Sequence, residues 1–121
     1  MSAIPDFTNE ELDVVKKTVA ERFGEPKDIE LADTEVRLNK ATIQLTMCPA
    51  VVWEARGCHF VIIKIGDNRY RNQFFYRGYQ QYGTGIEEYD DISNCTLILL
   101  RVQADHEAKE NEDAKKASNK T

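Results

Sequence analysis

The sequence predicts an α+β fold in which a single N-terminal amphipathic helix packs on a curved antiparallel sheet of about five or six strands. Three observations lead to this prediction. Apolar residues first recur at helical spacing, then alternate in twos through the middle of the chain, and beyond residue 104 none is larger than alanine. A length of 121 residues suits one domain. We therefore expect a single α+β domain over residues 1–104 and a disordered or fraying helical charged tail over residues 105–121.

The N-terminal helix is expected to begin at Thr8, because Thr8 and Glu11 have the spacing of a capping box. Gly24 followed by Pro26 is the usual order of residues that end a helix. Between these signals, one apolar stripe recurs at intervals of three and four residues: Leu12, Val15, Val19 and Phe23. This stripe is expected to face the core.

The next segment changes to the two-residue period of β-strands. Short strands are expected around Ile29 and Leu31, and again around Val36. A half-buried antiparallel strand should follow over residues 42–47 and be closed by Pro49. Residues 51–56 are expected to form a further short strand that leads into the central hairpin.

The central hairpin joins the apolar run at residues 60–65 to the aromatic segment at residues 69–77, through the turn formers Gly66, Asp67 and Asn68. If Asp67 and Asn68 are the two loop residues, the core face of the hairpin consists of Val61, Ile63, Ile65, Tyr70, Asn72 and Phe74. The outer face then consists of Phe60, Ile62, Lys64, Arg71, Gln73 and Phe75. This register places Lys64 directly opposite Arg71, and like charges in that position destabilise a sheet.

The hairpin segment is basic in an otherwise acidic chain. Residues 56–82 contain five basic residues and one acidic residue, whereas the whole chain has a net charge of −5. Two explanations stay open at this point. The basic residues could bind an anionic partner, or they could be neutralised internally by the acidic cluster of Glu87, Glu88, Asp90 and Asp91.

The last core element is expected over Cys95–Val102, after a turn at residues 91–94. Its apolar content favours a strand. The leucines and the helix-favouring residues behind it leave a long C-terminal helix as the alternative.

Catalytic and metal chemistry find little support. Cys48, Cys58, His59 and Cys95 lack the paired spacing of zinc ligands, and adjacent residues such as Cys58 and His59 point to opposite faces of a strand. We therefore expect no metal, no cofactor and no catalytic residue, and buried unreactive cysteines. A small cysteine-dependent or metal-dependent enzyme is the least favoured alternative.

The function expected from the sequence is that of a small non-catalytic binding or accessory protein that recognises a protein partner. The recognition surface would be the cationic and aromatic outer face of the hairpin, with these contact residues: Lys64, Arg69, Arg71, Phe75, Arg77 and Tyr79. The main alternative is a single-stranded nucleic-acid binder that uses the same face, since arginine planes and aromatic rings also stack on bases. The negative net charge argues against that alternative.

The expected location is the cytoplasm. Residues 1–5 have neither the basic nor the apolar region of a signal peptide. The three cysteines, an odd number without close spacing, fit a reducing compartment better than a disulfide framework. Uninterrupted apolar runs of four residues are too short to span a membrane, so no membrane association is expected. A homodimer formed through an open sheet edge is a further expectation left open by the sequence.

Overall fold

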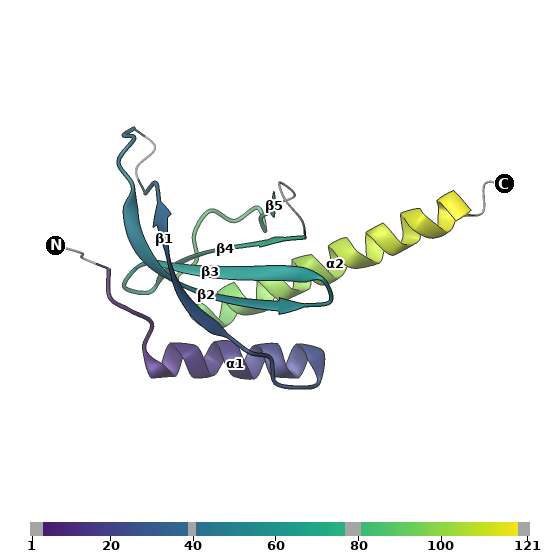
Figure 1. The fold of residues 1–121 in the computed structure, drawn as a ribbon, viewed down its shortest axis with the longest axis horizontal. Coiled ribbons are helices and arrows are strands. Elements are labelled where there is room, and N and C mark those ends of the chain that lie inside the picture. The colour runs from purple at the N-terminus through teal and green to yellow at the C-terminus, as the bar shows by residue number, and fades with distance from the viewer. Residues whose placement is uncertain (1–3, 39–40, 77–80, 119–121) are drawn as a thin grey trace.

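The computed structural model describes residues 4–38, 41–76 and 81–118, and confirms the α+β class with an antiparallel sheet (Figure 1). The elements follow in this order: α1 (Asn9–Phe23), β1 (Glu30–Val36), β2 (Thr46–Ala55), β3 (Cys58–Gly66), β4 (Arg69–Phe75), β5 (Gln81–Tyr82) and α2 (Ile92–Ser118). The strands lie in the sheet in chain order, β1-β2-β3-β4-β5. Four of them are long and β5 has two residues, so the predicted sheet of about five or six strands is matched only in part.

Helix α1 begins and ends at the residues that signal it in the sequence. The Thr8 hydroxyl accepts from the Glu11 backbone N–H at 3.1 Å, and the Thr8 N–H donates to Glu11 Oε1 at 2.7 Å, so the capping box is complete. Gly24 adopts the left-handed conformation (φ 74°), and its N–H donates to the Ala20 carbonyl at 2.8 Å. Local chemistry alone is enough to bound this helix.

The first two strands are longer than predicted, and the expected end at Pro49 is wrong. Strand β2 passes through Pro49, which lies opposite Asp33 of β1. Pairing of β2 with β3 starts only at Ala50, opposite Ile63. Pro49 therefore lies in a two-stranded ribbon of β1 and β2, where its missing N–H on the β3 side breaks no ladder.

The predicted register of the central hairpin is also wrong, by one residue. Phe60 lies opposite Phe74 and Lys64 opposite Tyr70, and the register shifts between Lys64 and Gly66. This irregularity places Ile65 as an extra residue in β3. Because side chains alternate, the shift exchanges the two faces of β3, while β4 keeps its predicted faces. The like-charge pair of Lys64 and Arg71 is thereby avoided.

The segment expected as a final strand is helical, so the prediction of a strand over Cys95–Val102 is wrong. Helix α2 begins at Ile92, where the Asp91 carboxylate accepts from the Ser93 N–H at 3.1 Å and the Asp91 carbonyl accepts from the Cys95 N–H. Its buried residues recur with helical spacing: Ile92, Cys95, Thr96, Leu99, Leu100 and Gln103. The helix continues to Ser118 and extends beyond the sheet in Figure 1. Disorder of residues 105–121 in solution stays a prediction.

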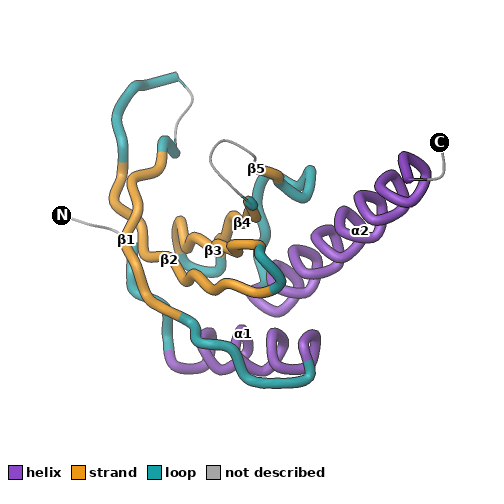
Figure 2. Tube along the Cα trace, turned by 45° about the vertical axis from the view of Figure 1, so that its right-hand side comes forward, coloured by secondary structure: helices purple, strands orange, loops and turns teal. Residues whose placement is uncertain are grey.

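Both helices pack on the same face of the sheet (Figure 2). Val15 and Val19 of α1 and Leu99 of α2 are fully buried in one apolar cluster with residues of β2, β3 and β4. Within this cluster, Trp53 and Phe60 stack with ring centroids 5.2 Å apart. The fold therefore has two layers, and no helix of the described residues lies over the second face of the sheet. In the described part of the chain, neither helix is long and apolar enough to cross a membrane.

Candidate functional site

Three of the five basic residues in the hairpin segment are paired with carboxylates of the same chain. Arg56 binds Glu107 of α2, with Nε 2.8 Å from Oε1. Arg69 binds Glu88 through two hydrogen bonds, of 2.9 and 2.8 Å. Lys64 binds Glu11, as described next. Part of the acidic cluster thus acts as an internal counter-charge, because Glu88 binds Arg69.

Lys64 is buried in the core, so its predicted position on the outer face is wrong. Only 3% of the residue is exposed, and its ammonium lies 2.7 Å from Glu11 Oε1 and 3.0 Å from the Asp6 carbonyl. The Tyr70 hydroxyl donates to the other oxygen of Glu11. We call Glu11, Lys64 and Tyr70 the buried triad. It connects α1 to β3 and β4.

The electrostatics of the buried triad follow from its pairing. Burial by itself raises the pKa of Glu11, but hydrogen bonds from Lys64, Tyr70 and Thr8, with the charge of Lys64, lower it below its ordinary value. The pKa of Tyr70 is raised by burial and by its bond to the Glu11 carboxylate. At neutral pH, Glu11 is thus an anion held by three donors, which is the arrangement that a buried charge requires.

The uncovered face of the sheet, here named the open face, is built from three rows that cross β2, β3 and β4. The pairing gives these rows as Ala50–Ile63–Arg71, Val52–Val61–Gln73 and Glu54–His59–Phe75. None of the nine side chains belongs to the core cluster on the other face. Most are half-buried, Glu54 is exposed and Ala50 is buried. The open face thus combines apolar, aromatic and charged groups.

Arg71 is the distinctive charge of the open face. Its described contacts include no carboxylate within ion-pair distance, in contrast to Arg56, Lys64 and Arg69. Its Nε is enclosed without an acceptor, and its Nη1 lies 3.5 Å from the Arg37 carbonyl oxygen, a long contact. A guanidinium presents five donors, so Arg71 keeps unused capacity for an anion.

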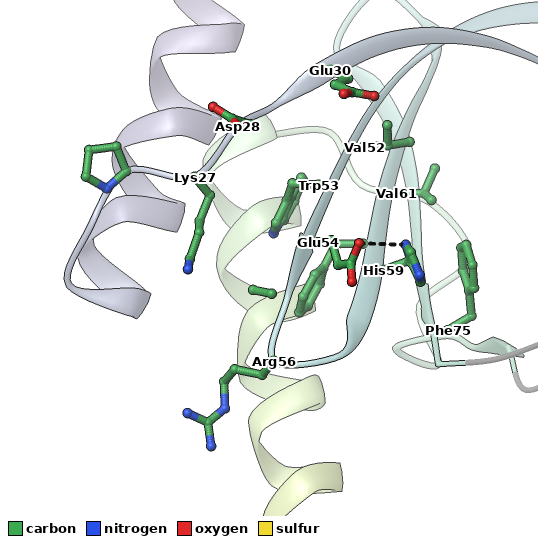
Figure 3. Close-up of a pocket in the computed structure, with 13 residues that line it drawn as sticks. Lys27, Asp28, Glu30, Val52, Trp53, Glu54, Arg56, His59, Val61 and Phe75 are labelled. Carbon is green, nitrogen blue, oxygen red and sulfur yellow. Dashed lines mark ion pairs between the residues drawn. The ribbon is translucent and has the colours of Figure 1, made fainter.

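The opposite end of the open face is aromatic. The rings of His59 and Phe75 stack with centroids 4.9 Å apart and an interplanar angle of 14°. The Nδ1 atom of His59 lies 4.0 Å from Glu54 Oε2, as the dashed line in Figure 3 marks. Val52 and Val61 pair with each other next to His59 and Phe75 in the same figure, and they add apolar side chains to this end of the open face.

The structure brings together only part of the predicted site. Arg71 and Phe75 lie on the open face, whereas Arg69 is exposed at the start of β4 and is paired with Glu88. Arg77 and Tyr79 lie outside the described residues. The prediction missed six open-face residues because it turned β3 over or did not extend to β2: Ala50, Val52, Glu54, His59, Val61 and Ile63. One feature of the sequence could have corrected the register. The predicted pairing placed the like charges of Lys64 and Arg71 opposite each other, and a shift of one residue removes this pair.

A surface hollow of about 820 Å³ lies where the loop before β1 passes β2 and β3 (Figure 3). Strand β1 starts at Glu30, opposite Val52, so residues 53–55 of β2 extend past it. Trp53 and Glu54 both line the hollow although adjacent strand residues point to opposite faces. The hollow therefore wraps around a strand edge and is not a single enclosed cavity.

The described residues offer no prepared nucleophile or metal centre. Cys48, Cys58 and Cys95 are free and buried. Burial raises the pKa of Cys58 to about 11 and that of Cys95 to about 12, so both thiols stay protonated at neutral pH. Within the ranges that the structure describes, no group of three or more His, Cys, Asp or Glu residues is arranged to hold a metal ion.

Comparison with family models, with curated proteins and with solved structures finds no match for this chain.

Proposed function

We propose that this chain is a small cytoplasmic accessory protein without catalytic activity, which recognises a protein partner through the open face of its sheet. The observation that carries this proposal is Arg71. It is a guanidinium on an uncovered sheet face, with no carboxylate of the described residues within ion-pair distance. The other described basic residues of the hairpin are neutralised within the chain.

The chemistry of the open face indicates the kind of partner. Arg71 suits a carboxylate, which can accept two parallel hydrogen bonds from a guanidinium. The half-buried Ile63, Val61 and Phe75 suit apolar side chains, since interface centres combine aromatic and apolar anchors with arginine. A partner segment with an acidic residue next to apolar ones satisfies both requirements. Glu54 at the far corner disfavours a uniformly acidic ligand.

The experiment compares three variants in affinity capture from a lysate of the source cells. Arg71→Met removes the charge and keeps an apolar stem, and Phe75→Ser removes the aromatic anchor. Arg101→Met is the matched control, because Arg101 is an exposed arginine on α2 with no described interaction. Equal far-ultraviolet circular dichroism and equal unfolding midpoints establish that all variants are folded.

We expect one protein to be captured by the parent and by Arg101→Met, and to be lost from both open-face variants. With the purified partner, Arg71→Met should weaken binding about tenfold or more, because a charge-assisted hydrogen bond contributes about 1.5–3 kcal/mol. Identical captured proteins for all four chains would refute the proposal. Binding of a labelled oligothymidine that falls steeply between 50 and 200 mM salt would instead support nucleic-acid recognition.

A further inference from the structure

The outer side of β1 is an open sheet edge. Strand β1 is the first strand of the sheet, and β2 is its neighbour in the sheet order. Among the described residues, no hydrogen bond joins β1 to a group outside the sheet. Five of its seven side chains are exposed and two are half-buried. A strand of this length with a free side is a template for another strand.

The register identifies which backbone groups face outward. Arg56 and Gly57 both have positive φ (53° and 76°) and form the two-residue turn between β2 and β3. In such a hairpin the closing residues, Ala55 and Cys58, form a hydrogen-bonded pair, and pairs then alternate along the strands. The other residues of β2 direct their backbone groups toward β1: Val52, Ala50, Cys48 and Thr46.

On β1, the residues opposite these four form backbone hydrogen bonds with β2. The remaining three residues of β1 present their N–H and C=O groups to the free side. These three are Leu31, Asp33 and Glu35. The position of Pro49 agrees with this assignment. Pro49 lies opposite Asp33, so its missing N–H is directed away from β1, where a proline is tolerated.

The ribbon formed by β1 and β2 also exposes large apolar side chains. Leu31 is 66% exposed and Met47 is 51% exposed. Leu45 and Ile43, in the loop before β2, are 51% and 91% exposed. Leu31 and Met47 lie on one side of the ribbon, because Met47 pairs with Glu35, which follows Leu31 by four residues on β1. An added strand would cover part of this surface.

The charge of β1 selects the occupant. Glu30, Asp33 and Glu35 are exposed, β1 has no basic residue, and none of the three has an ion-pair partner in the described chain. A second copy paired antiparallel about the strand centre would place Asp33 against Asp33, and parallel pairing would place every acid against itself. Like charges directly opposite are destabilising. A strand with basic residues opposite the three acids would be stabilised.

We propose that the free edge of β1 binds an extended basic segment of another protein, which adds to the sheet as an antiparallel strand. This surface is separate from the open face and does not depend on Arg71. The matching segment alternates so that lysine or arginine lies opposite Glu30, Asp33 and Glu35, and apolar residues lie opposite Leu31, Ala32 and Val36. Backbone hydrogen bonds at Leu31, Asp33 and Glu35 would hold it.

The probe is a synthetic peptide written for this register, Val-Lys-Thr-Lys-Val-Leu-Lys, with blocked ends and a fluorescent label. Its control replaces each lysine with glutamate. Fluorescence anisotropy at 50 mM salt should show saturable binding of the lysine peptide and at least tenfold weaker binding of the glutamate peptide. Equal binding of both peptides, or no saturable binding of the lysine peptide, would overturn the proposal.

The backbone register is tested on the unchanged protein with N-methylated lysine peptides. Methylation at one alternate set of positions should reduce affinity at least tenfold, and methylation at the other set should leave it within about threefold, because only one set of N–H groups faces β1. Equal effects of the two sets would overturn strand addition.

Protein variants provide an independent test of the same edge. Asp33→Pro removes an outward N–H without affecting the bonds to β2 and should abolish binding, whereas Asp33→Asn should weaken it by about two- to fourfold. The charge-matched control Asp13→Asn changes one exposed acid on α1 and should bind like the parent. Parent-like binding by a folded Asp33→Pro variant would contradict the proposal. So would a concentration-dependent dimer that Asp33→Pro abolishes, without peptide binding by the parent, because the occupant would then be a second copy.

Discussion

Replacement of Lys64 by methionine is the sharpest test of the tertiary structure. In the register predicted from the sequence, Lys64 is an exposed residue opposite Arg71, so its replacement would be neutral or slightly stabilising. In the structure, its ammonium is buried between Glu11 Oε1 and the Asp6 carbonyl. The two arrangements therefore predict effects of opposite sign on stability.

The magnitude follows from what the replacement leaves behind. Removal of one member of a buried ion pair costs about 3–5 kcal/mol, because the other charge stays buried without its partner. Glu11 keeps the hydrogen bonds from the Tyr70 hydroxyl and the Thr8 N–H. We therefore expect the lower end, about 3 kcal/mol, which is a large part of the stability of an ordinary domain. In a chain of this length it corresponds to a fall in Tm of about 10–15 °C.

The assay is urea unfolding followed by circular dichroism, with Tm measured in parallel. The double variant Glu11→Leu/Lys64→Met removes both charges, and we expect it to recover part of the loss, since apolar replacement of a buried pair is often close to neutral. Lys109→Met is the control for loss of an exposed lysine. A loss below about 1 kcal/mol for Lys64→Met would refute the buried position of this side chain.

Two further predictions concern titration and thiol chemistry. The pKa of Glu11 is lowered in the fold, so its stabilising contribution is complete above the ordinary carboxyl pKa of about 4.3 and is lost as the pH falls through the lower folded value. The difference in unfolding free energy between the parent and Glu11→Gln should therefore shrink as the pH falls from 7 to 3, and a constant difference would contradict the assignment. All three cysteines are buried and have raised pKa values, chiefly through desolvation. A chromogenic disulfide reagent at pH 8 should react with none of them in the native protein and with three after denaturation. Rapid reaction of one thiol in the native protein would contradict this prediction and would make a cysteine-dependent enzyme a candidate function again.

The sequence by itself determined the elements whose signals are local. The reciprocal hydrogen bonds of Thr8 and Glu11 and the left-handed conformation of Gly24 involve residues within four positions of one another. The period-two alternation likewise predicted an antiparallel sheet. Part of the candidate site was within reach for the same reason, since Arg71 and Phe75 of β4 lie on the predicted face.

Only the tertiary structure decided which face of β3 is buried and whether residues 95–102 form a strand or a helix. An apolar run such as residues 60–65 suits either face, and the irregularity at Ile65 selects one by burying Lys64 against Glu11, 53 positions earlier. The leucines of α2 suit strand and helix alike, and the helix is favoured by packing of Cys95 and Leu99 against the sheet and α1. Both choices depend on contacts between distant parts of the chain, which local periodicity does not contain.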